Sequence, residues 1–512
     1  METVIKQIIN KKIGIIFALI LTAEVLSFLA YIYPSLSAYF FLLVIVLATY
    51  LGIKNLKYLF FFSLAELIIG SQGRLFFLDL PFFSLSLRMA LWALMLIFFF
   101  FYLLKNLNRK KVKEENQVGI SLKNKPFYEF RYLSVFLLLM FFIFLGALIG
   151  VLSGHDLGVW LADFNAWLFL AWLFPVVYIF RKNPGEKILY ETLTVFIAAC
   201  LWLVFKSLFF LFIFSHDFFS LMGPLYRWSR VNYLGEITAL QAGFYRIFFQ
   251  SHLYSLIAVI LSWVALEKFK KLEFKQSKYI YLFLVLNLSA VLLSLSRSLW
   301  MGLAFFLLFY FLFKLRSWKF KQTLKRFMVL LSLFLMAFLV IAFVAKVPVL
   351  GQSGEFSAKD ILKERSSTEA DAGAISSRWS LLSPLSKKIL KAPVFGQGFG
   401  QEITYISQDP RVLESNPSGT YTTYAFEWAW LDVWLKIGFL GLLAYFWLLY
   451  RLIADSFKTR AFQPLVKALG WSLMAIAIVN IFTPYYNHPL GLGFLVVSAV
   501  IITRSKNIIY ER

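Results

Sequence analysis

An arginine stands alone in a long apolar run of this sequence. The run extends from Tyr279 to Phe313, and Arg297, in the stretch SLSRSLWMG, is its only formal charge. A run of this length is too long for one membrane helix of about 20 residues and suits two. Arg297 would then mark the turn between them at one membrane face. A guanidinium group in such a place can bind phosphate through two parallel hydrogen bonds.

More arginines are predicted at the same membrane face, and they are Arg74, Arg88, Arg227, Arg230 and Arg246. A charged side chain at bilayer depth costs about 2.5–3.5 kcal/mol on insertion scales, so it usually faces a polar cavity or a partner. Any single arginine could instead extend its side chain to the interface. All of them together favour an anionic ligand. Arg246 ranks above Arg74 and Arg88, because Gln250 and His252 follow it at spacings close to a helical turn.

A carboxylate in the stretch TYAFEWAWLDVWLKIGFLGLL is a candidate general base. Asp432 can pair with Lys436 four residues later on a helix, which is a structural role. Glu427 has no obvious local cation, and its aromatic surroundings would raise its pKa toward the range that a base needs at neutral pH. The alternative is an interfacial carboxylate near a helix N-terminus, where the helix dipole favours it.

Histidine and cysteine offer little further chemistry. The histidines are His155, His216, His252 and His488, all predicted at the outer side, and they form no H-E-x-x-H motif, so no metal site and no cofactor are predicted. The single cysteine, Cys200, excludes a disulfide scaffold. The stretch PYYNHPLG around His488 could line an acceptor entrance, although a turn with interfacial aromatic side chains is the commoner structure.

The elements that must position these residues are membrane helices. Hydrophobic residues make up 60% of the 512-residue chain and aromatic residues 19%, a balance that ordinary soluble cores do not have. The predicted apolar spans are 13–32, 36–53, 57–72, 82–104, 132–153, 163–180, 188–213, 251–267, 279–295, 298–313, 327–345, 429–450, 466–483 and 489–503. The predicted fold class is therefore all-α, a polytopic integral membrane protein with about 14 transmembrane helices and one long extracytoplasmic loop.

Charge gives this chain an orientation. The net charge of +24 could suggest nucleic acid, but the basic residues cluster in every second loop, as the positive-inside rule predicts. This places the N-terminus in the cytoplasm, and the basic-then-apolar start of the chain is interpreted as a retained first span. The segments expected are eight spans in 1–278, spans nine to eleven in 279–345, an outer loop in 346–426, and the last three spans in 427–512.

The outer loop contains the stretch SSRWSLLSPLSKKILKAPVFGQGFG. It predicts one or two short amphipathic helices from Ser376 to Leu390, a stop at Pro393, and a turn at three glycines, Gly396, Gly398 and Gly400. A G-x-G-x-G motif with no preceding strand is a weak phosphate signal. A tight turn that packs against the membrane face is the favoured interpretation.

These pieces, in this order, resemble the O-antigen ligase and O-antigen polymerase superfamily of bacterial envelope glycosyltransferases. The resemblance rests on LSLSRSLWMGLAFFLLFY, SSRW, PVFGQGFG and EWAWLDVWLKIGFLGLL, and covers roughly residues 280–450. It implies metal-independent transfer of a glycan from a polyprenyl-diphosphate carrier, such as undecaprenyl diphosphate, to an acceptor hydroxyl at the outer membrane face. By position, Arg297 and Arg378 match the family arginines that hold the diphosphate. Ligases tend to carry His-Asn where this chain has Glu427-Trp428, which leaves ligase and polymerase both open.

The resemblance also implies a location and partners. It implies a protein of the cytoplasmic membrane whose site faces the periplasm or exterior, with a carrier-linked glycan as donor and a glycan, lipid or protein as acceptor. Membrane lipids are expected partners, and nucleic acid is not. The alternative is a transporter or flippase of lipid-linked glycans, for which Lys206, deep in a predicted span, is the best candidate residue. Such a protein would show matched halves, and the single late loop has no counterpart.

Overall fold

A computed structural model describes most of the chain. The described residues are 11–80, 84–114, 130–240, 243–268, 274–315, 317, 319–349, 357, 369–459 and 463–510. The elements up to residue 268 are α2 (Lys11–Ile32), η1 (Pro34–Leu36), α3 (Ser37–Lys54), α4 (Leu56–Ile69), β1 (Phe77–Asp79), β2 (Ser84–Ser86), α5 (Leu87–Glu114), α6 (Leu133–Leu152), α7 (Leu157–Phe164), η3 (Asn165–Trp172), α8 (Leu173–Lys182), α9 (Lys187–Ser215), α10 (Phe219–Val231), β3 (Gly235–Ala239), β4 (Tyr245–Phe249) and α11 (His252–Lys268). Those that follow are α12 (Phe274–Leu293), α13 (Arg297–Leu315), α14 (Phe320–Lys346), α16 (Glu369–Lys391), β5 (Ile403–Ile406), α17 (Pro410–Ser415), β6 (Thr420–Thr423), α18 (Ala429–Lys458), α19 (Gln463–Val479) and α20 (Pro489–Tyr510).

The chain is an integral membrane protein built mainly from helices. In the described ranges, 9 helical segments are long and apolar enough to cross a membrane, and four shorter apolar helices accompany them. Each predicted span contains a helix, but α4 has only 14 residues. It would extend about 21 Å, less than the hydrocarbon core of about 30 Å. The prediction of fourteen full spans is therefore not confirmed.

Short strands are the second departure from the all-α prediction. They form antiparallel pairs, β1 with β2, β3 with β4, and β5 with β6. The sequence motif GFYRIFFQSH, predicted to enter a helix, instead supplies β4, and α11 begins only at His252. Four of the five residues of β4 are aromatic or β-branched, which suits a strand, and this preference outweighs the helical spacing of the polar residues.

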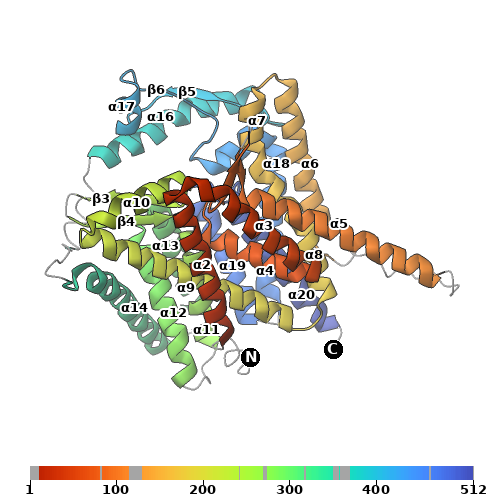
Figure 1. Cartoon of the computed structure of the whole chain (residues 1–512), viewed down its shortest axis with the longest axis horizontal. Helices are drawn as coiled ribbons and strands as arrows, with labels where there is room; N and C mark the ends of the chain where they lie inside the picture. Colours follow the sequence, from red (N-terminus) through yellow and green to blue (C-terminus); the bar gives the residue numbers. More distant parts are fainter. Residues whose placement is uncertain are drawn as a thin grey trace.

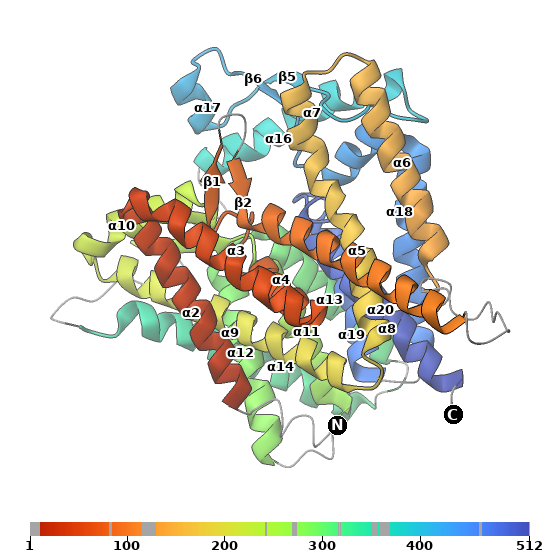
Figure 2. The same cartoon turned by 45° about the vertical axis from the view of Figure 1, so that its right-hand side comes forward.

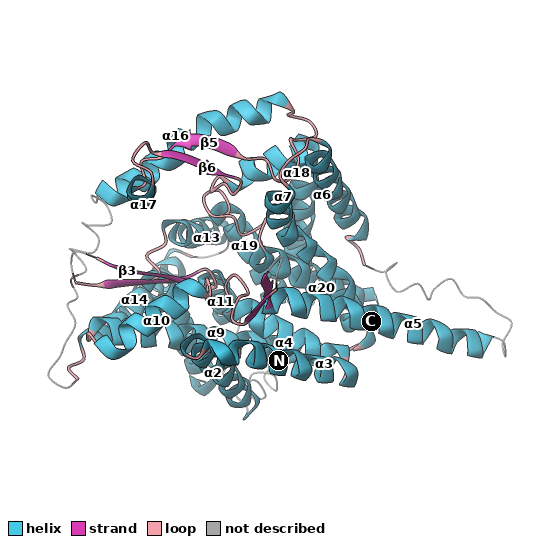
Figure 3. Ribbon diagram, turned by 45° about the horizontal axis from the view of Figure 1, so that its top comes forward, coloured by secondary structure: helices cyan, strands magenta, loops and turns pink. Residues whose placement is uncertain are grey.

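One end of the molecule carries the segment between α14 and α18. Figure 1 shows α16, α17 and the pair β5–β6 at this end, next to α6, α7 and α18. The first turns of α2 and the end of α20 lie toward the opposite end in both Figure 1 and Figure 2. Figure 3 shows β5–β6 alongside α16, with β3–β4 as a separate pair. A single helix, α16, covers the range predicted to hold one or two.

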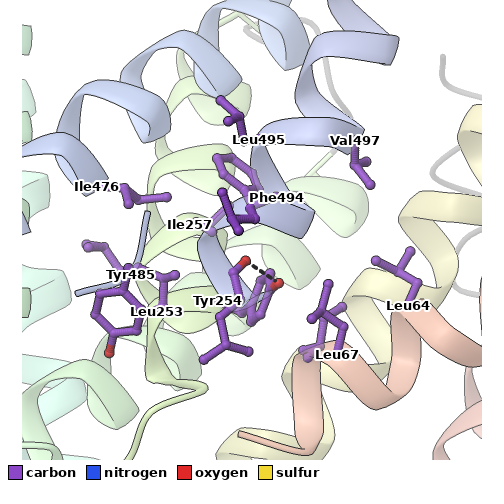
Figure 4. Packing of buried hydrophobic residues seen from close by; sticks show 14 of the residues in the cluster. Leu64, Leu67, Leu253, Tyr254, Ile257, Ile476, Tyr485, Phe494, Leu495 and Val497 are labelled. Carbon is purple, nitrogen blue, oxygen red and sulfur yellow. Dashed lines mark hydrogen bonds between the residues drawn. The ribbon is translucent and has the colours of Figure 1, made fainter. Parts of the chain in front are cut away.

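The apolar core lies where helices distant in sequence meet. Figure 4 shows Leu67 of α4, Ile257 of α11, Ile476 of α19 and Phe494 of α20 packed together, and all but Phe494 are almost fully buried. The hydroxyl of Tyr254 donates a hydrogen bond to the carbonyl of Leu490, 2.8 Å away. These helices are therefore held by one continuous core, while α16 packs through a smaller, separate cluster.

Lys206, the residue that suggested a transporter, forms a buried ion pair. Its Nζ lies 2.6 Å from Oε1 of Glu24, with the side chains 2% and 4% exposed. It also lies 4.9 Å from the ring centre of Phe249. The pair joins α9 to α2, so the charge has a structural partner inside the helix bundle.

We expect Glu24→Gln to destabilise the protein by about 3–5 kcal/mol, because it leaves the ammonium of Lys206 buried without its counter-charge. Unfolding in detergent, followed by denaturant or temperature, measures the effect. Glu191→Gln is the matched control, since Glu191 pairs with Lys57 at 3.2 Å in a more exposed place and should cost less than about 1 kcal/mol. Equal losses in the two variants would contradict a special role for the buried pair.

Reporter tags test the orientation independently of any substrate. Tags inserted after Lys111, Lys275 and Lys321 should report the cytoplasm, and a tag at Gly373 the exterior, because basic residues are retained on the inner side. An exterior signal after Lys275 would overturn the orientation.

Candidate active site

Arg297 is the first residue of α13, at the turn that follows α12. The predicted turn between two apolar helices is therefore confirmed. Leu295 adopts a left-handed backbone, with a φ of 45°, which makes the turn tight. The indole Nε1 of Trp300 donates to the carbonyl of Val291 at 3.1 Å and holds the two helices together. The Arg297 side chain is exposed, at the positive end of the α13 dipole.

Arg246 contacts this turn from the strand β4. Its Nε donates to the carbonyl of Ser294 at 2.9 Å, and its guanidinium lies 4.9 Å from the ring centre of Phe248. Nη1 also lies 3.5 Å from Oε2 of Glu236 on β3. The structure thus brings Arg246 to the turn that carries Arg297, and it does so from a strand pair, where the sequence predicted the entry of a helix.

The segment between α19 and α20 connects this turn with the neighbouring elements. The hydroxyl of Thr483 donates to Oγ of Ser298 at 2.8 Å, next to Arg297. The hydroxyl of Tyr485 donates to the carbonyl of Gln250 at 3.1 Å. The PYYNHPLG stretch therefore forms a turn between α19 and α20, with Tyr485 buried in the core.

Arg378 and Glu427 form an ion pair at the end of the molecule that carries α16. Nε of Arg378 donates to Oε2 of Glu427. The sequence offers Glu427 no local cation, and the fold supplies one from a distance, because Arg378 lies 49 residues earlier in the chain. Both side chains are partly exposed, at 38% and 51%. The pair joins α16 to the residues that lead into α18.

Three aromatic side chains, which we call the aromatic run, extend from this ion pair toward Thr483. Trp379 contacts Trp428 with ring centres 5.3 Å apart, and Trp428 contacts Phe482 at 5.2 Å. The indole Nε1 of Trp428 donates to the carbonyl of Arg378 at 2.8 Å. A continuous series of contacts thus leads from Arg378 and Glu427 through the aromatic run to the α13 turn.

A buried charged cluster anchors α18 beneath the ion pair. Nζ of Lys436 lies 2.6 Å from Oδ1 of Asp432, which confirms the predicted i, i+4 pair, and 2.5 Å from Oδ1 of Asp163 on α7. Asn487 donates to Asp432 at 2.6 Å, and the amide of Gly400 donates to Asp163 at 2.9 Å. Two carboxylates share one ammonium, and further hydrogen bonds satisfy them, as burial of charge requires.

The glycine-rich turn docks against α6 and α18. Gly398 has a φ of +85°, and a Cβ atom there would lie 2.3 Å from the amide nitrogen of Gly150. Gly438 interrupts α18 with a φ of 72°, and a Cβ atom there would lie 2.2 Å from the carbonyl of Val394. The amide of Phe439 donates to the carbonyl of Pro393 at 2.9 Å. The interpretation as a tight turn is confirmed, and the glycines contact backbone of this chain.

Other candidate residues have structural partners. Arg88 forms two hydrogen bonds of 3.0 Å to the carboxylate of Glu66 and one of 2.6 Å to the carbonyl of Ser71, in a buried place. The guanidinium of Arg74 lies over the rings of Phe77 and Tyr233, at 4.7 and 5.2 Å. Neither contributes to the contacts that join Arg297 to Glu427.

The two candidate histidines are poor bases in this environment. His252 is fully buried, with Nε2 2.8 Å from Oγ of Ser207 and Nδ1 accepting from the amide of Phe249. His488 lies between α19 and α20, where burial and the positive charge of Arg88 lower its pKa to about 3. A ring with so low a pKa binds a proton weakly at neutral pH. Within the described ranges, no three His, Cys, Asp or Glu residues gather as ligands for a metal ion.

Sequence reasoning missed three participants in this arrangement. Asp163 was detectable in principle, because a lone carboxylate inside an apolar span indicates a buried partner. Trp379 belongs to the quoted SSRW stretch but was given no role, and Phe482 gave no signal, since aromatic residues are common throughout this chain. Only the fold brings them to one place.

Fold and site together define an integral membrane protein with arginines and a carboxylate joined through aromatic contacts at one end. Residues 282–446 match the family model for O-antigen ligase, and this range contains Arg297, Arg378 and Glu427. This match confirms the resemblance to the O-antigen ligase and polymerase superfamily and supports a function in membrane glycosyl transfer. No curated protein matches the chain.

Proposed function

We propose that this protein transfers a glycan from a polyprenyl-diphosphate carrier to an acceptor hydroxyl at the outer face of the cytoplasmic membrane. The observation that carries the proposal is the connection between the Arg378–Glu427 pair and the turn that bears Arg297, through the aromatic run and Thr483. This connection supports the proposal that phosphate-binding groups and a proton acceptor act together in one site. The family match supports the same class of reaction.

The proposed reaction is a displacement at the anomeric carbon. The acceptor oxygen forms a bond to this carbon and loses its proton to Glu427, while the bond from the carbon to the diphosphate oxygen breaks. The electron pair of that bond leaves with the diphosphate. Arg297 and Arg378, with Arg246 beside them, stabilise the charge that develops on the leaving group, and electrostatic stabilisation of this kind dominates such reactions. The N-terminus of α13 adds amide donors of the kind that bind anions.

The Arg378–Glu427 pair also suggests how donor and base are coupled. A diphosphate competes with Glu427 for the guanidinium of Arg378, because both are oxygen anions suited to the same donors. When the donor takes over contacts to Arg378, the carboxylate is released toward the acceptor hydroxyl. The ion pair then represents the protein before donor binding.

The alternative transporter or flippase has no specific observation in its favour among the described residues. Lys206, its best candidate, is held by Glu24 inside the bundle. A transporter would also leave the carrier–glycan bond intact. The two functions therefore differ in the product that they release.

Deletion of the gene tests the proposal and separates its two forms. A full-length carrier-linked chain that accumulates in the deletion strain indicates a ligase, and a single carrier-linked repeat unit indicates a polymerase. A flippase defect would instead leave the carrier-linked glycan at the cytoplasmic face, inaccessible to an added external enzyme. An unchanged set of carrier-linked glycans would contradict the proposal.

A further inference from the structure

Trp379 has a large exposed surface that the proposed reaction does not yet use. It follows Arg378 on α16, and 59% of the residue is exposed. The packing of α16 depends on other residues, since Leu381, Leu385 and Ile389 form the buried side against Phe426. The exposed indole is therefore available for a contact outside the helix packing.

The indole is also held in place. Trp428 meets it in an edge-to-face arrangement, with an angle of 66° between the rings. Trp428 is itself fixed by its hydrogen bond to the carbonyl of Arg378 and by Phe482. A rigid aromatic surface loses little conformational freedom when it binds a ligand, which favours affinity.

We propose that Trp379 is a sugar-binding platform that stacks on a pyranose ring of the carrier-linked glycan. A pyranose presents C–H groups on its ring face and hydroxyls around its edge, so it matches an apolar aromatic surface beside a few polar groups. Arg378, which precedes Trp379 in the chain, and Glu427, which Arg378 contacts, are the polar groups beside this surface. This inference rests on the proposed function, because it takes the glycan of the donor as its ligand.

An exposed tryptophan near a membrane can also serve as an interfacial anchor, which is the alternative role for Trp379. The chain offers a matched tryptophan that separates this role from sugar binding. Trp447 on α18 is 47% exposed, and it also has one aromatic neighbour, Tyr450, at 5.7 Å. It belongs to a candidate membrane span and lies outside the contacts of the site.

The test compares two ligands that differ only in the sugar. The full-length protein in lipid nanodiscs is titrated with undecaprenyl diphosphate and with undecaprenyl-diphosphate-linked glycan extracted from a strain that lacks the gene. We expect Trp379→Ala to weaken binding of the glycan-linked carrier by about tenfold and to leave undecaprenyl diphosphate unaffected. Trp379→Phe should retain most of the affinity for the glycan-linked carrier, and Trp447→Ala should change the affinity for neither ligand.

The other outcomes are decisive as well. Unchanged glycan affinity in Trp379→Ala, or an equal loss for both ligands, would overturn the platform and leave an anchor or a packing residue. If the wild-type protein bound neither ligand, the proposed function would fail, and the platform with it.

Discussion

Arg297→Lys and Arg378→Lys should each reduce glycan transfer by about a hundredfold or more, the loss typical when one donor to a developing negative charge is removed. Lysine keeps the positive charge but presents a single ammonium in place of the planar fork that binds two phosphate oxygens at once. Both arginines are exposed or partly exposed, so the variants should fold and insert normally. Transfer by purified protein, per amount of folded protein, measures the effect.

The control for this result is an arginine of the same predicted membrane face outside the site. Arg227 is exposed on α10, and Arg227→Lys should retain normal transfer. Near-normal activity in both Arg297→Lys and Arg378→Lys would show that charge alone suffices there. The proposed bidentate binding of the diphosphate would then be wrong.

Glu427→Gln should lower transfer by about 10²- to 10⁴-fold, the usual contribution of a general base. Glutamine preserves the shape of the side chain and can still accept a hydrogen bond from Arg378, but it cannot take the acceptor's proton. Binding of undecaprenyl diphosphate should therefore persist in this variant. Turnover and binding, measured on the same preparation, separate the two effects.

Asp432→Asn is the companion variant for the base. Asp432 is buried between Lys436 and Asn487, and Lys436 keeps Asp163 as a counter-charge when Asp432 is neutralised. We expect a smaller loss of transfer than in Glu427→Gln. Full turnover in Glu427→Gln, together with a large loss in Asp432→Asn, would place the base elsewhere.

Features set by neighbours in sequence could be predicted. Arg297 is a lone charge between two apolar runs, and that pattern alone located the turn between α12 and α13. The contact of Asp432 with Lys436 follows from helical spacing. Gly396, Gly398 and Gly400 indicated a tight turn, because glycine adopts backbone conformations that few other residues tolerate.

Features that depend on distant parts of the chain could not be predicted. Glu427 has its cation in Arg378, across the whole of β5, α17 and β6, so the sequence around it suggested an unpaired carboxylate. The third member of the Lys436 cluster, Asp163, lies 273 residues away. Arg246 was predicted on the wrong element, because a stretch of five residues can fit a strand as well as a helical turn.

The separation between Asp163 and its partners has a consequence for synthesis of the protein. The amide of Gly400 that caps Asp163 follows it by 237 residues, and the ribosome adds about 5–20 residues per second. Asp163 is therefore made on the order of ten to fifty seconds before Gly400 and Lys436 are translated. During this interval α7 holds a carboxylate that no residue of the cluster can neutralise. The docking of α7 on α18 through this cluster is accordingly a late event, completed only after α18 has emerged, long after α7 itself was translated.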